Sequence, residues 1–535
     1  MAQALPPEPV AVGLENAAAL SAGLSHAHAT PAEAEALPLV RAESTRLVAS
    51  LADAAAIDRD GAIPTPLRTA VAEAGLFGLT VPEEHGGAGF SLKAACAVIA
   101  DLAAIERSTA IMIGLHSGLG VRPLVELGSA ELRARMLPEI VAGTRIASFA
   151  ATEAEAGSDL TGIRTTGTPT DDGLRLDGEK VYVTNGGFAG CYTVLARTPG
   201  LGGQRAHSLV FVPRETPGVT IGPEEDKLGI RGSSTVTVTF EGAVVPRGMI
   251  LGEAGRGIDQ AHAALSWGRT LMAAGCVGTA RAALDLALSH VTSRRQFGKP
   301  IGDFTASRAH VARMAARLYA SETLVRWVGH ALASGQPIDE LSLAAKVLCS
   351  EASFEICDRA LQLHGALGFI EPTGVARLLR DCRITRIFEG ANDVLLVRGG
   401  AAVLGRKPAP TPARLPLPGP LEREAKAWEA LRARFSDATQ SVRTEHGVGV
   451  VRHQLVLQAV ARANLALLAA LGCLLRAQAR PDELGLARHA AEDLLFEAEQ
   501  HLNELGRAVR DEARVHAVSD QLYAPLSRAS KEEPS

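Results

Sequence analysis

The sequence predicts a mainly helical protein with a small antiparallel β domain in its middle and an extra helical unit at its C-terminal end. Three observations support this fold class. Residues 39–146 and 256–404 carry apolar side chains at three- and four-residue spacing, which is typical of helices with one buried face. Residues 147–255 hold short β-rich runs separated by Gly, Asp and Pro, as antiparallel strands do. A proline-rich stretch at 405–420 then precedes renewed helical periodicity in 421–535.

The composition excludes several classes of protein. Hydrophobic residues make up 47% of the 535-residue chain but aromatic residues only 4%, as in a folded, largely helical protein. The net charge of −5 leaves no basic surface for nucleic acid, so we expect no nucleic-acid partner. No metal-ligand spacing is present, so no metal is expected. No G-x-G-x-x-G motif follows a strand, which argues against a nicotinamide site.

The cysteines and the N-terminal residues predict a cytoplasmic protein of bacterial type. The seven cysteines form no C-x-x-C pair, and an odd number of scattered thiols is typical of a reducing compartment. No Lys or Arg precedes Arg41, which fits neither a secretory signal nor a transit peptide. The longest apolar run, residues 465–475, is roughly half of the ~20 residues that a spanning helix needs. We therefore expect no transmembrane segment.

Taken in order, the chain begins with residues 1–38, which are rich in Ala, Pro and Glu and are expected to form a disordered tail. The helical domain at 39–146 is divided by a glycine-rich turn at 81–90. The β domain at 147–255 follows, and then a bundle of four or five helices at 256–404.

The linker at 405–420 is expected to be stiff and extended, because its prolines forbid a helix. The helical domain at 421–535 contains no pattern of an active site. Its apolar face has three possible uses, as a core, as a dimer interface or as a weak contact with a membrane surface, and a core is the commonest of these. Residues 531–535 are expected to be disordered.

One carboxylate, Glu389, is the candidate catalytic base. A helical segment with arginines at every third position precedes it, Gly390 ends that segment, and Asn392 or Asp393 has the short polar side chain that caps a following helix. Glu389 is therefore predicted to lie in a loop between two helices, beside apolar neighbours. Such neighbours desolvate a carboxylate, which raises its pKa and makes it a stronger base toward a carbon acid. Taken alone, a solvated loop glutamate is the commoner outcome of this pattern.

Two segments of the β domain suit a flat ligand. Residues 149–159 end a strand and turn through small residues, so the backbone there is accessible to a ligand. Residues 180–187 follow past a predicted hairpin and place Tyr182 and Thr184 on one face of a strand. The isoalloxazine ring of a flavin is planar, with an apolar centre and polar edges, and an aromatic ring beside a hydroxyl fits it.

Together with three further motifs, at 294–299, 362–369 and 387–393, these segments resemble the acyl-CoA dehydrogenase family. The likeness extends from about residue 45 to 404, in the family's order of helical, β and helical domains. Within the family the chain most resembles the very-long-chain subgroup, which has a C-terminal extension like the last unit here. The resemblance implies FAD as cofactor, an acyl-CoA substrate of medium to very long chain, and an electron-transfer flavoprotein as electron acceptor.

The resemblance also implies where FAD binds. Thr152 would lie near its pyrimidine edge and Thr184 near flavin N5, while Tyr182 stands where many members have Trp. Arg294 would contact the pyrophosphate. Residues 362–366 would reach the FAD of a neighbouring subunit, which implies at least a homodimer. The full set of implied FAD contacts is Phe149, Ala151, Thr152, Ser158, Tyr182, Val183, Thr184, Arg294, Gln296, Phe297, Gln362, Leu363, His364, Gly365, Ala366, Ala391, Asn392 and Asp393.

The reaction implied by the resemblance is α,β-dehydrogenation, with Glu389 as the base that removes the α proton. The implied substrate contacts are Ser158, Ser266, Trp267, Gly268, Arg269, Phe388 and Gly390. Two residues depart from the family pattern: Ala391 replaces a common Thr, and Leu396 replaces a common Arg. The first removes a hydroxyl near the flavin and the second a cation near the substrate, which leaves the acyl-chain preference open.

Two other functions fit the same residues less well. One is a flavoenzyme of this fold that uses O2, such as an acyl-CoA oxidase or a flavin monooxygenase. The other is a non-catalytic assembly or scaffold protein that kept the fold. The presence of Glu389 and of the flavin motifs counts against the scaffold.

Overall fold

The structure, a computed structural model, describes residues 17–171, 173–203, 206–406, 415, 417 and 419–529. It divides into two compact units. The large unit is Gly23–Ala391, and the small unit combines Met1–Ala22 with Asn392–Ser535. The boundary therefore falls before the helix α15 (Asn392–Gly405), which we expected to close the helical bundle at residue 404. Most of the predicted proline-rich linker lies outside the described residues, but Leu415 and Leu417 are buried.

The N-terminal part of the large unit is helical, as expected. Its bounds are α3 (Pro31–Leu51), α4 (Ala54–Asp60), α5 (Thr65–Glu73), α6 (Leu92–Ile105), α7 (Arg107–Leu115), a π-helical turn (His116–Gly120), α8 (Arg122–Leu127) and α9 (Ala130–Val141), with short 3₁₀ turns at Leu76–Gly78 and Glu83–His85. The glycine-rich break at 81–90 is a turn region, as predicted.

The prediction of a disordered tail over residues 1–38 is wrong from residue 17 onward. The helix α2 (Ala17–Leu24) and the start of α3 occupy much of this range, and residues 1–16 lie outside the described part. Thr30 caps α3 through the Glu33 amide, with Pro31 at the first turn, where proline is tolerated. The Glu33 carboxylate accepts from the backbone and the hydroxyl of Ser91. Composition alone does not reveal this cap or this distant partner.

The β domain is one mixed sheet with the order β6-β7-β3-β2-β4-β5-β8, to which β1 adds by pairing with β4. The short β-rich runs of residues 147–255 fall within strands, and two of these runs, at 174–176 and 181–183, belong to a single strand, β3. The sheet is not wholly antiparallel, because β1 and β2 both pair with β4 in parallel. Side-chain alternation is the same in both orientations, so the sequence could not show this. The bounds are β1 (Ala147–Ala150), β2 (Thr166–Pro169), β3 (Gly173–Thr184), β4 (Cys191–Arg197), β5 (His207–Pro213), β6 (Val219–Glu224), β7 (Thr235–Pro246) and β8 (Ile250–Leu251).

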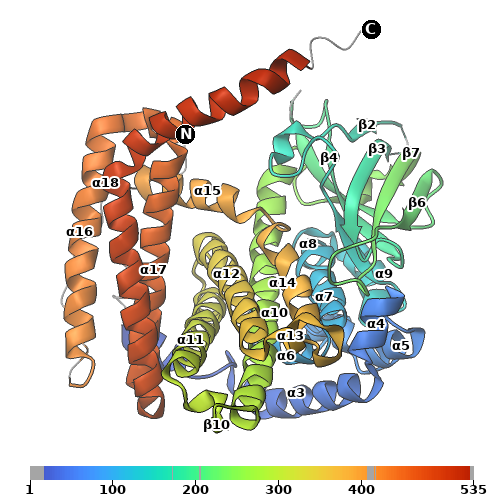
Figure 1. The fold of residues 1–535 in the computed structure, drawn as a ribbon. Coiled ribbons are helices and arrows are strands. Elements are labelled where there is room, and N and C mark those ends of the chain that lie inside the picture. The colour runs from blue at the N-terminus through green and yellow to red at the C-terminus, as the bar shows by residue number, and fades with distance from the viewer. Residues whose placement is uncertain are drawn as a thin grey trace. The chain divides into compact units, whose positions relative to one another are not determined.

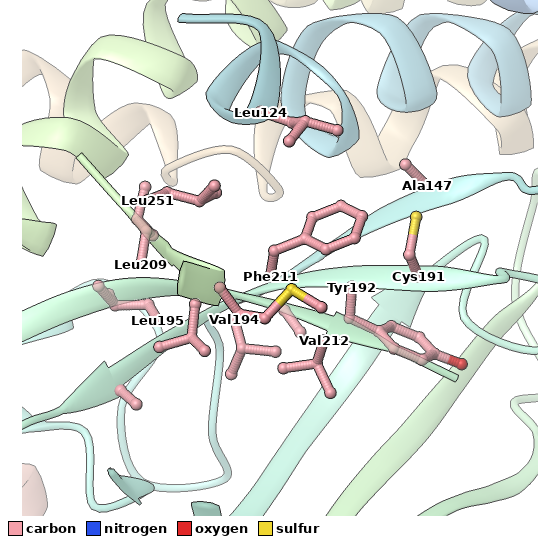
Figure 2. Packing of buried hydrophobic residues seen from close by; sticks show 14 of the residues in the cluster. Leu124, Ala147, Cys191, Tyr192, Val194, Leu195, Leu209, Phe211, Val212 and Leu251 are labelled. Atoms are coloured by element: carbon pink, nitrogen blue, oxygen red, sulfur yellow. The ribbon is translucent and has the colours of Figure 1, made fainter. Parts of the chain in front are cut away.

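The core of the β domain lies around β4 and β5. Both strands are almost entirely buried, and Figure 2 shows Phe211 on the side of the strands that faces Leu124 of α8 and Val194 on the opposite side. The hydroxyl of Tyr192 donates to the carbonyl of Gly186, which satisfies the polar end of a buried ring. This packing joins the sheet to the N-terminal helices and makes it a rigid support for the segments at its edge.

The second helical part of the large unit is the predicted bundle of four or five helices. Its bounds are α10 (Gly257–Ser293), a hairpin of β9 (Arg295–Gln296) and β10 (Lys299–Pro300), α11 (Thr305–Ala333), α12 (Asp339–His364), α13 (Ala366–Phe369) and α14 (Val375–Arg383), followed by a 3₁₀ turn at Ile384–Arg386. The long helix α10 is the centre of this part, since α6, α11 and α12 all pack on it (Figure 1). A Cβ at Gly278 would collide with the carbonyl of Ala100, so this glycine permits the close approach of α10 to α6.

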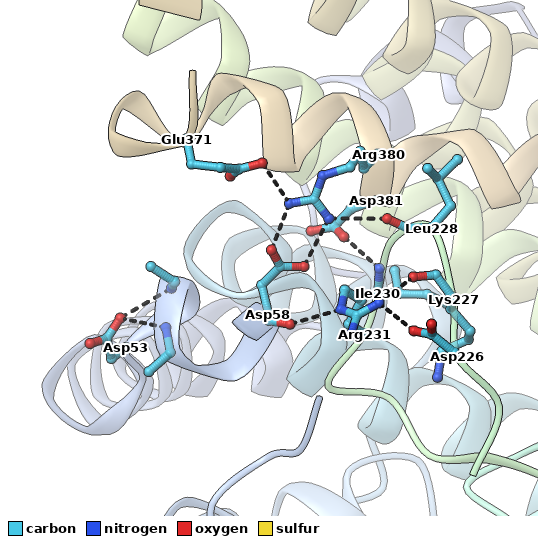
Figure 3. Close-up of polar contacts among 12 residues, drawn as sticks. Asp53, Asp58, Asp226, Lys227, Leu228, Ile230, Arg231, Glu371, Arg380 and Asp381 are labelled. Carbon is cyan, nitrogen blue, oxygen red and sulfur yellow. Dashed lines mark hydrogen bonds and ion pairs between the residues drawn. The ribbon is translucent and has the colours of Figure 1, made fainter. Parts of the chain in front are cut away.

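A polar cluster fixes α14 against the rest of the large unit (Figure 3). Arg380 forms a bidentate ion pair with Asp58 of α4 and also contacts Glu371. The buried Asp381 accepts from the backbone N–H of Ile230 at 2.5 Å, in a loop where Ile230 has φ +46°. Because α14 leads directly into the loop of Glu389, these contacts fix the start of that loop.

The small unit is built from long helices that pack side by side: α15, α16 (Glu422–His446), α17 (Gln454–Ala479) and α18 (Leu484–Ala529). A Cβ at Gly400 would collide with the carbonyl of Leu457, so this glycine permits α15 to pack closely on α17. Residues 466–475 of α17 are buried, so most of the longest apolar run is core. The predicted disorder of 531–535 lies outside the described residues.

Among the described residues, two helices are long and apolar enough to cross a membrane, α10 and α17. In each, 72% of the apolar window is buried inside the folded chain. This is how the core helices of a folded domain behave, and it agrees with the expectation that the run at 465–475 does not span a membrane.

Candidate active site

Glu389 lies in a loop, as predicted, between the turn at Ile384–Arg386 and α15. Its backbone is left-handed, with φ +56°, and Gly390 follows with φ +101°. A non-glycine residue in this region costs of order 1–3 kcal/mol and persists where the surroundings enforce it, typically at functional sites. The backbone N–H of Glu389 donates to no acceptor within the described residues, so it is free to bind a ligand.

The carboxylate of Glu389 is desolvated although the residue as a whole is half-buried. Both of its oxygens are buried, and neither has a hydrogen-bond partner in the described part of the chain. Burial raises the pKa of Glu389 to about 7, against the opposing pull of Arg269, Lys346 and Arg107. A carboxylate with these properties exchanges a proton near neutral pH, as a general base must.

Two cationic side chains hold the Glu389 loop through its backbone carbonyls. Arg269 Nε donates to the carbonyl of Glu389 at 3.0 Å, and Lys346 Nζ donates to the carbonyl of Gly390 at 2.7 Å. Lys346 is fully buried, and burial lowers its pKa to about 8. The sequence reasoning included Arg269 but missed Lys346. The available signal was a single lysine in the apolar helical run 344–349.

A cavity that is partly open to solvent lies in front of the carboxylate. Apart from two charged residues its lining is mostly apolar: Ile99, Arg107, Ala110, Ile111, Gly114, Leu115, Gly268, Leu271, Met272, Phe388 and Glu389. A Cβ at Gly268 would stand 3.0 Å from Glu389 Oε2 and closer still to Leu119. Gly268 therefore leaves the space that the carboxylate faces, and an alkyl chain fits the apolar walls.

The predicted substrate residues separate into two groups. Gly268, Phe388, Arg269 and Gly390 line the cavity or fix the loop beside it. Ser266 instead donates to Asp339 at 2.7 Å, and the ring of Trp267 lies 3.8 Å from the guanidinium carbon of Arg122. Ser158 is exposed, in the turn after β1.

The two predicted flavin segments are adjacent in the structure. The backbone N–H of Val181 donates to the carbonyl of Thr152 at 2.9 Å, and Ser148 Oγ donates to the carbonyl of Thr184. Phe149 and Thr152 are half-buried, and Ala151 is buried. These contacts place residues 148–152 beside residues 181–184.

A bulge shapes the strand at Tyr182. The pairing of β3 with β7 shifts register between Lys180 and Val183, and Tyr182 has φ +56°. Tyr182 is 65% exposed and Thr184 half-buried, while Val183 between them is buried. The side-chain hydroxyls of Thr152 and Thr184 donate to no acceptor in the described residues. An exposed aromatic ring on a segment that also offers available hydroxyls fits a planar ring with polar edges, so this wall suits a flavin.

The remaining predicted FAD contacts form a second surface. Arg294 ends α10, and Gln296 and Phe297 lie in the hairpin after it, where Phe297 and Gly298 have the positive φ angles of a type I′ turn. Phe297 is 94% exposed. Residues 362–366 end α12, with Gln362, Gly365 and Ala366 exposed, Leu363 half-buried and His364 buried.

A ring contact joins the two parts of this second surface. His364 stacks on His290 of α10 at 4.3 Å, and Arg294 and His364 both help to lower the pKa of His290, after burial. Leu367, Phe369 and Ile370 next to it are exposed. Ala391 is half-buried at the end of the large unit, whereas Asn392 and Asp393 begin α15 in the small unit.

Family models match the chain over three consecutive regions: the acyl-CoA dehydrogenase N-terminal domain at residues 35–144, its middle domain at 148–243 and its C-terminal domain at 255–404. The chain belongs to the acyl-CoA dehydrogenase family. This family is FAD-dependent, and the three matches follow one another along the chain as N-terminal, middle and C-terminal domains.

Three similar proteins support the assignment. The very long-chain specific acyl-CoA dehydrogenase of Bos taurus is 35% identical over 359 residues, which cover 66% of this chain and 55% of the bovine protein, so the chain matches about half of that relative's length. Butyryl-CoA dehydrogenase from Megasphaera elsdenii has a TM-score of 0.66 at 31% identity and covers 68% of this chain and 98% of its own. An acyl-CoA dehydrogenase from Bacillus anthracis, solved with FAD, has a TM-score of 0.77 at 26% identity. The match covers 89% of this chain and 88% of the Bacillus anthracis chain.

Proposed function

We propose that the protein catalyses the FAD-dependent α,β-dehydrogenation of acyl-CoA thioesters to trans-2-enoyl-CoA, with Glu389 as the base. One observation carries the proposal: a desolvated carboxylate with a pKa of about 7 and no partner in the described residues faces a mostly apolar cavity. Known proteins that are similar to this chain include enzymes named as acyl-CoA dehydrogenases. FAD, when bound, supplies the acceptor for the hydride that leaves the β carbon.

The residues around Glu389 prepare the removal of the α proton. At neutral pH a large fraction of the carboxylate is ionised, since its pKa is about 7. The free N–H of Glu389 would donate to the thioester oxygen and stabilise the negative charge that develops as the proton leaves. Arg269 and Lys346 fix this N–H by their bonds to the adjoining carbonyls, so the donor needs no reorganisation during the reaction.

The residues of the flavin wall would hold and orient the cofactor. Tyr182 would stack on the ring, and Thr152 and Thr184 would offer hydroxyls to its polar edges. Arg294 would contact the pyrophosphate of a neighbouring subunit's FAD, together with residues 362–366. The side chains of Phe297, Leu367, Phe369 and Ile370 are exposed in the single chain and support a homodimer as the working form.

For the substrate we propose a fatty acyl chain at the medium-length end of the expected range, in β-oxidation. The cavity is bounded by the charged side chain of Arg107, which favours a chain of limited length. For the electron acceptor we propose an electron-transfer flavoprotein, on family grounds. The proposed location is the cytoplasm.

A weak contact with a membrane surface through the small unit is a further proposal. Val515, Val518, Leu522 and Tyr523 of α18 are exposed and recur with the spacing of one helix face. Sedimentation with liposomes tests it, and an unchanged soluble fraction at all lipid concentrations would remove it.

Dye reduction with a series of acyl-CoA thioesters tests the proposed activity. FAD-loaded protein should reduce an artificial electron acceptor in the presence of acyl-CoA, and the product should be the trans-2-enoyl-CoA. Peroxide formation without the dye would instead favour an oxidase or monooxygenase that uses O2. A purified protein that takes up no FAD would favour a scaffold role. The chain-length series then measures the preferred substrate.

A further inference from the structure

Arg107 is a buried cation in the same cavity as Glu389. It begins α7, is 3% exposed, and lines the cavity together with the Glu389 side chain. The other walls of the cavity are apolar or glycine. The family motifs and the reaction described above assign no role to this arginine.

The guanidinium of Arg107 lacks an anionic partner. Its Nη2 contacts Cys276 Sγ at 3.8 Å, which is a weak acceptor, and its Nε is buried without a hydrogen bond. No carboxylate in the described residues lies within ion-pair distance of it. The neighbouring Glu106 is occupied, because its two oxygens accept from the amides of Ser108 and Thr109.

A buried cation without a partner is costly, and its position increases the cost. Desolvation of a charged group is strongly unfavourable unless the charge is paired. Arg107 also lies at the first position of a helix, where the helix dipole is positive and disfavours a cation. Glu389 neutralises this charge only in part near neutral pH, because its carboxyl is then partly protonated and forms no ion pair with Arg107. Such a cation is typical of a site completed by an anionic ligand.

The two charged groups lie toward opposite ends of the cavity. The contacts between α7 and α10 run antiparallel: Gly114 lies beside Leu271, and Arg107 lies beside Gly275, whereas Glu389 lies beside Gly268. Seven residues of α10 separate Gly268 from Gly275, which is about 10 Å along a helix. An acyl chain with its α carbon at Glu389 would therefore extend toward the guanidinium.

We propose that the preferred substrate carries a carboxylate at the far end of its acyl chain, which Arg107 binds as an ion pair. The substrate class is the mono-CoA thioester of a dicarboxylic acid. This inference rests on the proposed dehydrogenase function and narrows its substrate. Arg107 presents a planar fork of donors, which matches the two oxygens of a carboxylate.

The test compares two thioesters of equal carbon number, one with a terminal carboxylate and one with a terminal methyl. The FAD-loaded wild type is expected to favour the carboxylate by about 10- to 100-fold in kcat/KM, as for one charge-assisted contact. Arg107→Met should reverse the preference, and Arg107→Lys should retain part of it. Arg281→Met is the matched control, because Arg281 lies on α10 but pairs with Asp101 and Glu322 outside the cavity. In this variant the ratio of kcat/KM for the carboxylate-bearing thioester to kcat/KM for the methyl-terminated thioester should equal that of the wild type.

A binding measurement separates this proposal from the proposed activity. Calorimetric titration of the FAD-loaded Glu389→Gln variant should show tighter binding of the carboxylate-bearing thioester, and the double variant Glu389→Gln/Arg107→Met should lose the difference. Equal kcat/KM and equal binding for the two thioesters in the wild-type background would overturn the proposal. An equal loss of kcat/KM for both thioesters in Arg107→Met would also overturn the proposal. The role of Arg107 would then be to lower the pKa of Glu389. If no thioester reduces the bound flavin, the proposed activity fails instead.

Discussion

Replacement of Glu389 by Gln should make the large unit more stable at alkaline pH. In the folded state the pKa of Glu389 rises from 4.5 to about 7, mainly because its carboxylate is buried. The folded protein therefore binds this proton more tightly than the unfolded chain does. The stabilisation from the protonated form is complete below about pH 4.5 and is lost as the pH rises through about 7.

The size of the effect follows from this shift. At about 1.4 kcal/mol per tenfold change in proton affinity, the ionised carboxylate lowers the free energy of unfolding by about 3 kcal/mol at pH 9. The Glu389→Gln variant has no such penalty. Relative to the wild type it should therefore gain about 2.5 kcal/mol between pH 5 and pH 9, while contributions from groups that do not interact with Glu389 cancel in the difference.

Urea unfolding of both proteins at several pH values measures this gain. Trp267 and Trp327 lie in the large unit and Trp428 in the small unit, so a Trp428→Phe background makes the fluorescence report on the large unit alone. A difference between the two proteins that stays constant from pH 5 to pH 9 would refute the reasoning, since it would mean that the Glu389 carboxyl titrates as it does in water.

Two further predictions concern the supports of the Glu389 loop. Lys346→Met removes a cation that lowers the pKa of Glu389, so the alkaline rise of kcat/KM for acyl-CoA should move to higher pH, and an unchanged profile would contradict the role of Lys346. Asp381→Leu leaves the buried N–H of Ile230 without an acceptor and should lower the free energy of unfolding by about 1–3 kcal/mol, whereas Asp381→Asn keeps an acceptor oxygen and should cost clearly less. Urea denaturation of both variants at pH 7 measures the free energy of unfolding. Equal decreases in the two variants would show that the hydrogen bond to Ile230 does not cause the loss of stability.

The sequence was sufficient for the order of the domains and for the loop that carries Glu389. Helical periodicity, short β runs and the glycine after Glu389 are local signals, and all of them appear in the fold at the expected positions. The flavin segments are likewise adjacent, as the hydrogen bond from the N–H of Val181 to the carbonyl of Thr152 shows.

What the sequence did not reveal depends on contacts between distant residues. Lys346 lies in an otherwise apolar helical run and Arg107 lies at the start of α7, and only packing brings them close enough to influence Glu389. The left-handed backbone at Tyr182 results from a bulge that side-chain alternation does not show. The assignment of α15 to the small unit depends on the close approach of Gly400 to α17, which is a tertiary contact.

Anaerobic mixing of the FAD-loaded protein with acyl-CoA tests the role of Glu389 most directly. The visible absorption of the oxidised flavin should disappear in the wild type, faster at pH 8 than at pH 6, because the base must be ionised. The Glu389→Gln variant should bind FAD and acyl-CoA but retain its flavin absorption. Rapid loss of this absorption in the variant, at a rate close to that of the wild type, would show that another group removes the α proton.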